Sequence, residues 1–383
     1  MIDNFGLLPV TLVAALAGGA MLALIAGFGT PLVQRLGADP RTVRQLLRVL
    51  HLALILCLPL AGAFADHLGA ERGVVVGALL AAAGVGLLAV REQQTLALLS
   101  VMLIAAGTAC LCTAAAALFV ATFLPGRPVA AVNLGYVVLG LAWLGAPLLL
   151  ERLLAALQPR RALLLLALAC VLTAAVAALT PVAYFPTYRH GELAAVFQHP
   201  TVWVAGVAAL FYLPVERAMA RWTTEQLPQQ GYAPRGAALL LGAFWVAFFA
   251  GRALAALAIL GGRIVPAGRE PWFLFLLAIC VAVGIGNLAG AGPRSSLGVG
   301  VVLVGLFSGP IYPTILGSVV QQFPQEPGTA FGITAAVAAF GGVLLQPLAQ
   351  RDARAGGIGR LMRVPVVSAL LVAAAVLVWA ITP

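Results

Sequence analysis

The sequence contains no lysine, and charged residues of every kind make up only 9% of its 383 residues, whereas hydrophobic residues make up 62%. A soluble domain normally carries about 25% charged residues, because its surface must be covered with polar groups. This scarcity of charge excludes a water-soluble globular protein. It predicts a chain whose surface lies mostly in a lipid bilayer.

Residues that bind metals or form disulfides are also scarce. The five cysteines all lie within apolar stretches, where cysteine usually acts as a small hydrophobic residue. The pair Cys110 and Cys112 lacks the spacing and companion ligands of a zinc site. We therefore expect no disulfide, no metal and no cofactor.

Acidic residues are few, so that 22 basic residues, all arginine, give the chain a formal net charge of +10. No basic run is interleaved with aromatic residues, and nucleic acid is not an expected partner. Most arginines lie between apolar stretches, where they can anchor the chain at anionic headgroups. The lipid bilayer is the partner that this composition predicts.

The apolar residues fall into twelve stretches, each about long enough to cross a bilayer as a helix. The connections between them are short and hold most of the arginine, proline and glycine. The predicted spans are 6–33, 45–66, 71–90, 94–122, 128–150, 161–183, 200–220, 235–258, 271–290, 296–318, 328–349 and 362–381.

The longest connection, 184–199, divides these stretches into six and six. Gly62 and Gly251 close the second and eighth stretches at corresponding places, which indicates a weak internal repeat. Two inverted or parallel repeats of this kind are typical of secondary transporters. We therefore predict an all-α membrane protein of 12 transmembrane helices in two six-helix bundles, 1–183 and 200–383, joined by a central loop, 184–199.

The turn after the second stretch reads Gly62-Ala-Phe-Ala-Asp66-His67-Leu-Gly69-Ala-Glu71-Arg72. It resembles the loop signature of the major facilitator superfamily, in which this loop acts as a latch that holds one conformation. The resemblance implies that role for Gly62, Asp66, Gly69 and Arg72, with Asp66 able to pair with an arginine. His67 and Glu71 stand where the family has cations, which weakens the latch or makes it sensitive to pH.

The second half carries a partial counterpart of this turn. Gly251 and Arg252 are expected to form the equivalent of the latch there, but Ala255 stands at the position that matches Asp66. An ordinary turn with a hydrogen-bonded aspartate is the alternative reading of the first motif.

Four short patches narrow the resemblance to the fucose-permease-like branch of the superfamily, whose members are sugar:proton symporters. They are Phe211-Tyr212-Leu-Pro-Val-Glu216-Arg217, Phe244-Trp245 with Gly251-Arg252, Asn133-Leu-Gly135, and Ser308-Gly-Pro310-Ile-Tyr312-Pro313-Thr314. The resemblance implies transport of a sugar-like solute by alternating access.

Glu216 is the one acid well inside an apolar stretch. An ionisable group at membrane depth is costly, usually faces a cavity and is a functional candidate by default. Because low-dielectric surroundings favour the neutral carboxyl, Glu216 is the candidate for proton coupling. The alternative is a structural ion pair with Arg217 or Arg221.

Other residues are candidates for substrate binding. Tryptophan faces suit the C–H faces of a sugar ring, and the prolines of the tenth stretch predict a broken helix that exposes hydroxyl groups. Each candidate has a structural alternative, such as an interfacial tryptophan belt or a hydrogen bond between helices. The candidates besides Glu216 are Tyr212, Trp222, Trp245, Tyr312, Asn133 and Gln346.

The chain departs from the fucose-type symporters in one respect that matters for coupling. Those proteins carry acids in the first and fourth helices, whereas 6–33 and 94–122 hold no charged residue here. Either Glu216 takes over proton coupling or the protein is a facilitator without coupling.

Several arginines suggest a second function. Arg44, Arg48 and His51 share one helical face, at i, i+4 and i+7, and with Arg217 and Arg221 they can attract an anion. Arginines that extend to the headgroups are the alternative. An organic-anion transporter on the same fold is therefore the second candidate. A drug:proton antiporter is less consistent with the sequence, and no motif of an intramembrane enzyme is found.

The expected location is the cytoplasmic membrane, with a small-molecule substrate and protons as partners and a monomer as the assembly. The superfamily motif places both termini in the cytoplasm. The positive-inside rule favours the opposite orientation, because most arginines fall in the loops after odd-numbered stretches. We follow the motif and expect both termini on the cytoplasmic side.

Overall fold

The computed structural model of the chain describes residues 4–27, 39–90, 93–180, 193–229, 231–289, 294–354 and 362–381, and these residues are helical with short turns. Eleven of the described helices are long and apolar enough to cross a membrane, and Pro327–Gly341 is a shorter apolar helix. Within the described residues the predicted spans match these helices with small differences at their ends, and residues 28–33 and 181–183 of two predicted spans lie outside the described part.

The first half of the chain supplies six long helices. They are α1 (Leu8–Gly27), α3 (Pro40–Leu68), α4 (Ala70–Val90), α5 (Gln94–Thr122), α6 (Pro128–Ala156) and α7 (Pro159–Leu179). A short helix, α8 (Leu193–Gln198), follows in the segment expected to be the central loop, whose residues 184–192 lie outside the described part.

The second half supplies the other spans, one of them in two pieces. They are α9 (Pro200–Arg221), α11 (Pro234–Leu260), α12 (Glu270–Ala289), α13 (Arg294–Ser308), α14 (Ile311–Gln322), α15 (Pro327–Arg354) and α17 (Arg363–Ile381). A π-helical turn (Trp222–Gln226) and the short α10 (Leu227–Gln229) connect α9 to α11.

Proline and glycine set many of the helix ends. Seven of the long helices after α1 have proline at the first or second position, where its missing N–H costs nothing. Asp39 caps α3 by accepting a hydrogen bond from the Thr42 amide at 2.6 Å. Gly69 has a φ of 98° between α3 and α4, so the tight turn predicted at this glycine is confirmed.

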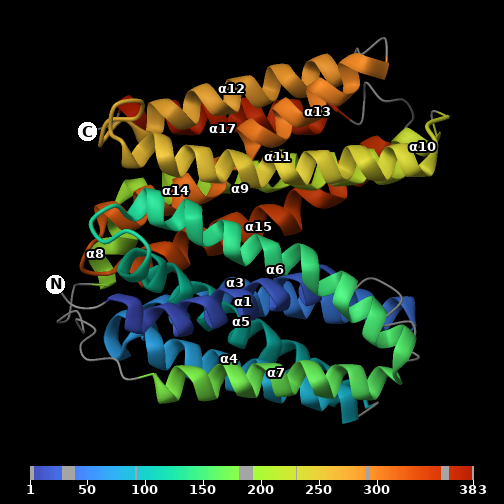
Figure 1. Cartoon of the computed structure of the whole chain (residues 1–383), viewed down its shortest axis with the longest axis vertical. Coiled ribbons are helices and arrows are strands. Elements are labelled where there is room, and N and C mark those ends of the chain that lie inside the picture. The colour runs from blue at the N-terminus through green and yellow to red at the C-terminus, as the bar shows by residue number, and fades with distance from the viewer. Residues whose placement is uncertain are drawn as a thin grey trace.

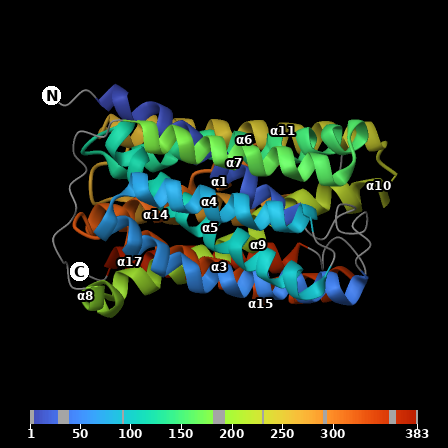
Figure 2. The ribbon, with the colours of Figure 1, turned by 90° about the horizontal axis from the view of Figure 1, so that it is seen from below.

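The helices pack as two bundles, each with its own core. Buried side chains of α1 to α7 form most of one core, and those of α8 to α17 form the other. Figure 1 shows α4 and α7 on one flank and α12, α13 and α17 on the opposite flank, with α6, α9, α14 and α15 between them. Figure 2 shows α6 with α11 along one face of the molecule and α3 with α15 along the opposite face.

The tenth span is broken between α13 and α14, as its prolines predict. Pro310 cannot donate to the Leu306 carbonyl, and Pro313 cannot donate to the Gly309 carbonyl. Helical hydrogen bonding resumes when the Thr314 amide donates to the Pro310 carbonyl at 3.0 Å. The break leaves carbonyl groups that need donors from other helices.

The two bundles are tightly joined near α8. A Cβ atom on Gly62 of α3 would overlap the Gly328 carbonyl of α15, and one on Gly332 would overlap the Leu58 carbonyl. Between α6 and α14, a Cβ on Gly317 would lie 2.7 Å from the Val129 Cα. Backbones approach this closely only where side chains are missing. We call this end of the molecule the α8 end.

The joints loosen toward the opposite end, which carries α10 (Figure 1). On α11, Gly242 has no atom within 4 Å of a Cβ placed on it, although Trp245 on the same helical face still contacts α6. Arg44 and Arg48 of α3 are exposed toward this end. The bundles are therefore in contact at the α8 end and diverge at the α10 end.

We predict that Gly62→Ala destabilises the joint at the α8 end, because the new methyl group must push α3 away from α15. Dipolar distances between spin labels on the two bundles should lengthen at that end. The matched control is Gly286→Ala on α12, where a Cβ meets nothing within 4 Å. An unchanged distance in Gly62→Ala would show that the joint does not depend on this glycine.

Candidate functional site

Four helices bring polar and aromatic side chains together beside the break in the tenth span. On α9, Tyr212 and Glu216 lie one turn apart on the same face. Arg252 comes from α11, Tyr312 from α14 and Tyr136 from α6. We call these five residues the central cluster. It combines one acid and one base with three phenols, and it contains residues of both bundles.

Tyr212 joins Glu216 to the broken helix. Its side chain is fully buried, and its hydroxyl donates to the Ser308 carbonyl at 2.9 Å. The Glu216 carboxyl interacts with the same hydroxyl and with the charge of Arg252. Glu216 itself keeps part of its surface exposed, as does Tyr312. Glu216 and Tyr312 are therefore half-buried, whereas Tyr212 and Arg252 are buried.

Arg252 provides the missing donor at the helix break. Its Nε donates to the Gly309 carbonyl at 3.0 Å, the group whose donor is lost at Pro313. Its Nη1 donates to the Tyr136 carbonyl of α6 at 2.8 Å. The guanidinium also lies 4.4 Å from the centre of the Phe248 ring, within the range of a cation–π contact.

Aromatic rings surround these polar groups. Tyr312 stacks on Tyr212 with ring centres 6.0 Å apart and meets Tyr136 edge-on at 5.8 Å. Trp245 meets Trp143 of α6 edge-on at 5.0 Å. Tyr136 and Trp143 were not among the sequence candidates, although Tyr136 follows Asn133 by three residues and could have been found on that helical face.

Asn133 lies apart from the central cluster, in the joint between α6 and α14. Its Nδ2 donates to the Thr314 hydroxyl at 3.0 Å and to the Val129 carbonyl at 2.9 Å. Its Oδ1 is buried without a hydrogen-bond partner. In this conformation the amide connects the bundles and faces no exposed space.

The structure separates Trp222 from the central cluster. Trp222 is completely buried in the core of the second bundle, and its Nε1 has no partner. In the described part of the chain it makes no ring contact with the central cluster. The side chain of Gln346 lies outside the described residues.

The predicted loop latch connects the two bundles at the α8 end. Asp66 accepts hydrogen bonds from the backbone amides of Gly328 and Thr329 at 2.8 and 2.7 Å, and from the Thr329 hydroxyl at 2.7 Å. These amides belong to the first turn of α15, where N–H groups have no helical acceptor and the helix dipole favours an anion.

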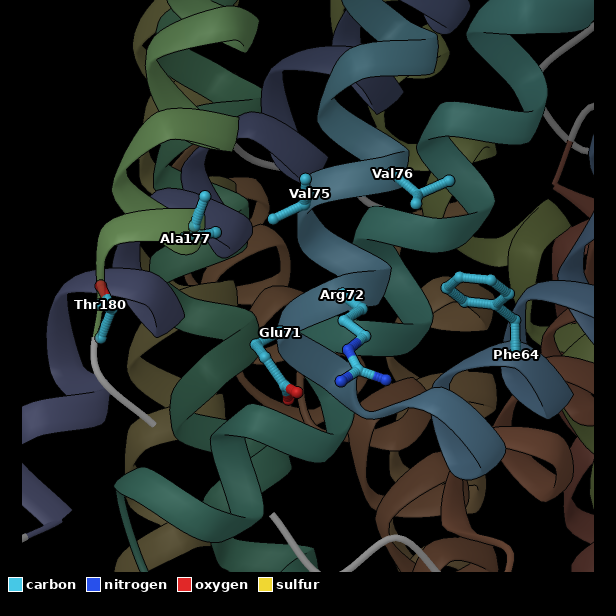
Figure 3. Close-up of a pocket in the computed structure, with 8 residues that line it drawn as sticks. Phe64, Glu71, Arg72, Val75, Val76, Ala177 and Thr180 are labelled. Atoms are coloured by element: carbon cyan, nitrogen blue, oxygen red, sulfur yellow. The ribbon is translucent and has the colours of Figure 1, made fainter. Parts of the chain in front are cut away.

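The arginine partner expected for Asp66 is replaced by this helix terminus. Arg72 instead points from the first turn of α4 into a groove of about 490 Å³, with Glu71 beside it (Figure 3). Phe64 of α3 and Ala177 of α7 line the same groove. The helix terminus satisfies Asp66 without a cation, so Arg72 is not needed at that carboxylate.

Glu326 lies in the turn before α15, close to Asp66. Partial burial, and to a smaller extent the negative charge of Asp66, raise the pKa of the Glu326 carboxyl, while His67 opposes the shift. Protonation of Glu326 therefore favours the closed joint.

The second-half latch is not a mirror image of the first. Gly251 packs against the Leu306 carbonyl within its own bundle, whereas Gly62 packs across the two bundles. Arg252 lies in the central cluster two turns before the end of α11, and not in a loop. The expectation of a second latch came from matching positions in the two halves of the sequence. Such a match does not tell which face of the helix a residue lies on.

The candidates for an anion site lie toward the α10 end. Arg44 and Arg48 are exposed on α3, and the Nδ1 atom of His51 is 2.7 Å from the Leu47 carbonyl. His51 lies close enough to Arg217 of α9 to interact with its charge. The side chain of Arg221 lies outside the described residues. Basic groups of both bundles thus face the same region.

Comparison with known families finds one match that covers most of the chain. The family model described as Major Facilitator Superfamily matches residues 7–346. Comparison of the sequence with curated proteins finds no relative.

Solved structures of similar fold cover nearly the whole chain. A major facilitator superfamily transporter, FucP, in its outward conformation, is 19% identical, with a TM-score of 0.74 over 98% of this chain and 99% of that one. A variant of the E. coli fucose:proton symporter FucP is 17% identical, with a TM-score of 0.77 over 100% and 99%. The human organic anion transporter MFSD10 is 17% identical, with a TM-score of 0.71 over 97% and 98%.

We predict that Asp66→Asn weakens the closed joint, because the neutral amide accepts less strongly from the α15 amides. A hydrogen bond to a charged group contributes about 2 kcal/mol, so the closed state should lose up to about 30-fold in population relative to the open one. The population can be measured by alkylation of a single cysteine introduced at the closed joint. Labelling as slow as in the parent protein would contradict the latch.

Proposed function

The chain belongs to the major facilitator superfamily, and we propose that it carries a small, sugar-like polar solute across the membrane by alternating access, coupled to protons. It is a multi-pass membrane transporter. The observation that supports the proposal most directly is the central cluster, in which Glu216 is partly exposed among side chains of both bundles.

Alternating access requires two bodies that pivot about the substrate site. We take these bodies to be the bundles 1–183 and 200–383, with the segment 184–199 between them. The tight joints at the α8 end and the divergence at the α10 end fit one end state of such a cycle. With the termini in the cytoplasm of the cell, as the loop motif suggests, this state faces outward.

A sugar-like substrate suits the surroundings of Glu216. Sugar rings present C–H faces that pack on aromatic rings and hydroxyl groups that need hydrogen-bonding partners. Tyr312 is partly exposed and stacked on Tyr212, while Trp245 and Trp143 provide an aromatic wall nearby. We assign substrate contact to Tyr312 and Glu216 first, and to Trp245 second.

Trp222 and Asn133 are less suited to first contact with the solute in this conformation, because both are buried away from the cluster. We retain Asn133 as a group that becomes available when the joint between α6 and α14 opens. Gln346 stays a candidate for substrate binding only because it is a lone amide in an apolar stretch of the sequence.

Proton coupling falls to Glu216, because the first and fourth spans have no acid that could replace it. Loss of a proton from Glu216 creates a charge next to Tyr212 and Arg252. The same residue can therefore respond both to the solute and to the proton gradient.

An organic anion is the second candidate substrate. The specific observation in its favour is that Arg44, Arg48 and His51 of one bundle lie toward the same end as Arg217 of the other, and that His51 and Arg217 interact electrostatically. A cleft lined by charges of one sign concentrates ions of the opposite sign. MFSD10, a protein of similar fold, is an organic anion transporter.

We predict that Glu216→Gln abolishes pH-driven accumulation of labelled fucose or xylose in proteoliposomes, while counterflow without a proton gradient persists. The amide keeps the hydrogen bond to Tyr212 but cannot release a proton. Glu151→Gln, at an exposed position of α6, is the matched control and should accumulate solute like the parent. Accumulation by Glu216→Gln under a proton gradient would remove Glu216 from the coupling step.

We predict that replacing both Arg44 and Arg48 with Gln distinguishes the two substrate classes. For a neutral sugar the rate of uptake at low salt should change less than about twofold, whereas for an organic anion it should fall about tenfold or more, since steering by charge is lost. A second measurement of the substrate class is competition by neutral and by carboxylated sugars against uptake of one labelled solute. Inhibition by the carboxylated compounds alone would favour the anion.

A further inference from the structure

The position of Arg252 links the two bundles more closely than its place in the sequence suggests. The side chain is only 5% exposed and originates on α11 of the second bundle. Its Nη1 donates to the Tyr136 carbonyl of the first bundle, and its Nε donates to the Gly309 carbonyl at the break in the tenth span. One guanidinium thus holds α11, α6 and the helix break together.

The opposing helix has a space that fits this guanidinium. A Cβ on Gly140 of α6 would lie 3.1 Å from the Arg252 Nη1 and would overlap the ring of Phe249. The ring of Phe248 covers one face of the guanidinium at 4.4 Å. The planar group is therefore inserted edge-on against α6, in a slot that only glycine leaves open.

Glu216 competes with those carbonyl groups for the same charge. Tyr212 binds the Ser308 carbonyl, which is adjacent in sequence to the Gly309 carbonyl that Arg252 binds. Arg252 and Arg217 are the two cations close enough for their charge to act on Glu216. An ionised carboxylate can accept two parallel hydrogen bonds from a guanidinium, which a single carbonyl oxygen cannot do.

Several other titratable groups lie around Glu216. Tyr212 and Arg217 lie on its own helix, Tyr312 on α14 and Tyr136 on α6, and His51 of α3 faces Arg217. Among the described side chains, α15 and α17 bring no titratable group to Glu216. Of the groups whose charges act on Arg252, three are phenols and Glu216 is the one carboxyl.

We propose that Arg252 is a positioning residue that fastens α11 to α6 while Glu216 is neutral, and that ionisation of Glu216 draws the guanidinium away and loosens this joint. The inference rests on the proposed function and adds to it how the proton on Glu216 controls reorientation of the empty carrier. The empty carrier with a proton on Glu216 is held closed at the α8 end, which prevents a proton leak. The empty carrier without that proton is free to reorient.

The test measures the joint itself, without any solute. Spin labels are placed at positions 127 and 264, which flank α6 and α11 at the α8 end, and dipolar distances are recorded between about pH 5 and about pH 9, where a perturbed carboxyl can titrate. The background carries Glu326→Gln, because protonation of Glu326 would also favour closure. Neutral Glu216 favours the closed joint, so the short-distance population should fall about tenfold as pH rises.

The variants give separate expectations. Glu216→Gln should keep the short distance at every pH. Arg252→Gln should give a longer distance that no longer depends on pH. Gly140→Ala blocks the slot and leaves Arg252 unchanged, so it should also give a longer distance that does not depend on pH. It replaces Arg252→Gln in the test if that variant does not fold.

Two outcomes would overturn the inference. One is a pH response in Arg252→Gln or Gly140→Ala equal to that of the parent. The other is a parent joint that tightens as pH rises. Failure of sugar transport has a different signature, because the labels would still respond to pH while solute uptake is absent.

Discussion

The carbonyl group of Gly309 has no hydrogen-bond donor within its own helix, because residue 313 is proline, and the surrounding membrane offers none. Arg252 meets that need from another helix. Placing a guanidinium there brings a charge into the interior, which in turn gives Glu216, Tyr136 and the ring of Phe248 their positions around it. The break in the tenth span thus leaves one backbone group without a donor, and the same guanidinium that satisfies it also makes the contact between the bundles.

Two joints between the bundles, one at the α8 end and one in the central cluster, use different chemistry for the same task. Between α3 and α15, glycines allow the backbones to meet, and Asp66 satisfies the first amides of α15. Between α6 and α11, a buried guanidinium binds a carbonyl of the other bundle. Backbone groups are the partners in both cases, so each joint is either made completely or left with costly unpaired groups. Such joints favour two distinct states over a continuous range, as alternating access requires.

Much of the fold could be predicted from the sequence, and less of the site. Apolar stretches of about 20 residues predict spanning helices directly, and Pro310 and Pro313 predict the break between α13 and α14. The partner of Asp66 could not be predicted, because a helix N-terminus distant in sequence offers backbone amides that no side-chain pattern encodes. Arg252 was assigned to a loop for a similar reason, since its partners are carbonyl groups. Trp143 was missed because an aromatic residue in an apolar helix has no distinctive spacing, whereas Tyr136 could have been found from its position three residues after Asn133.

The central claim is that the two bundles move as bodies about the central cluster, so that one end closes when the other opens. Spin labels at Leu148 of α6 and Leu239 of α11, both exposed near the α10 end, report the open end, and labels near α8 report the closed end. The account predicts that any condition that lengthens the distance at the α8 end shortens the distance between 148 and 239. Distances that lengthen together at both ends, or that never change, would contradict it.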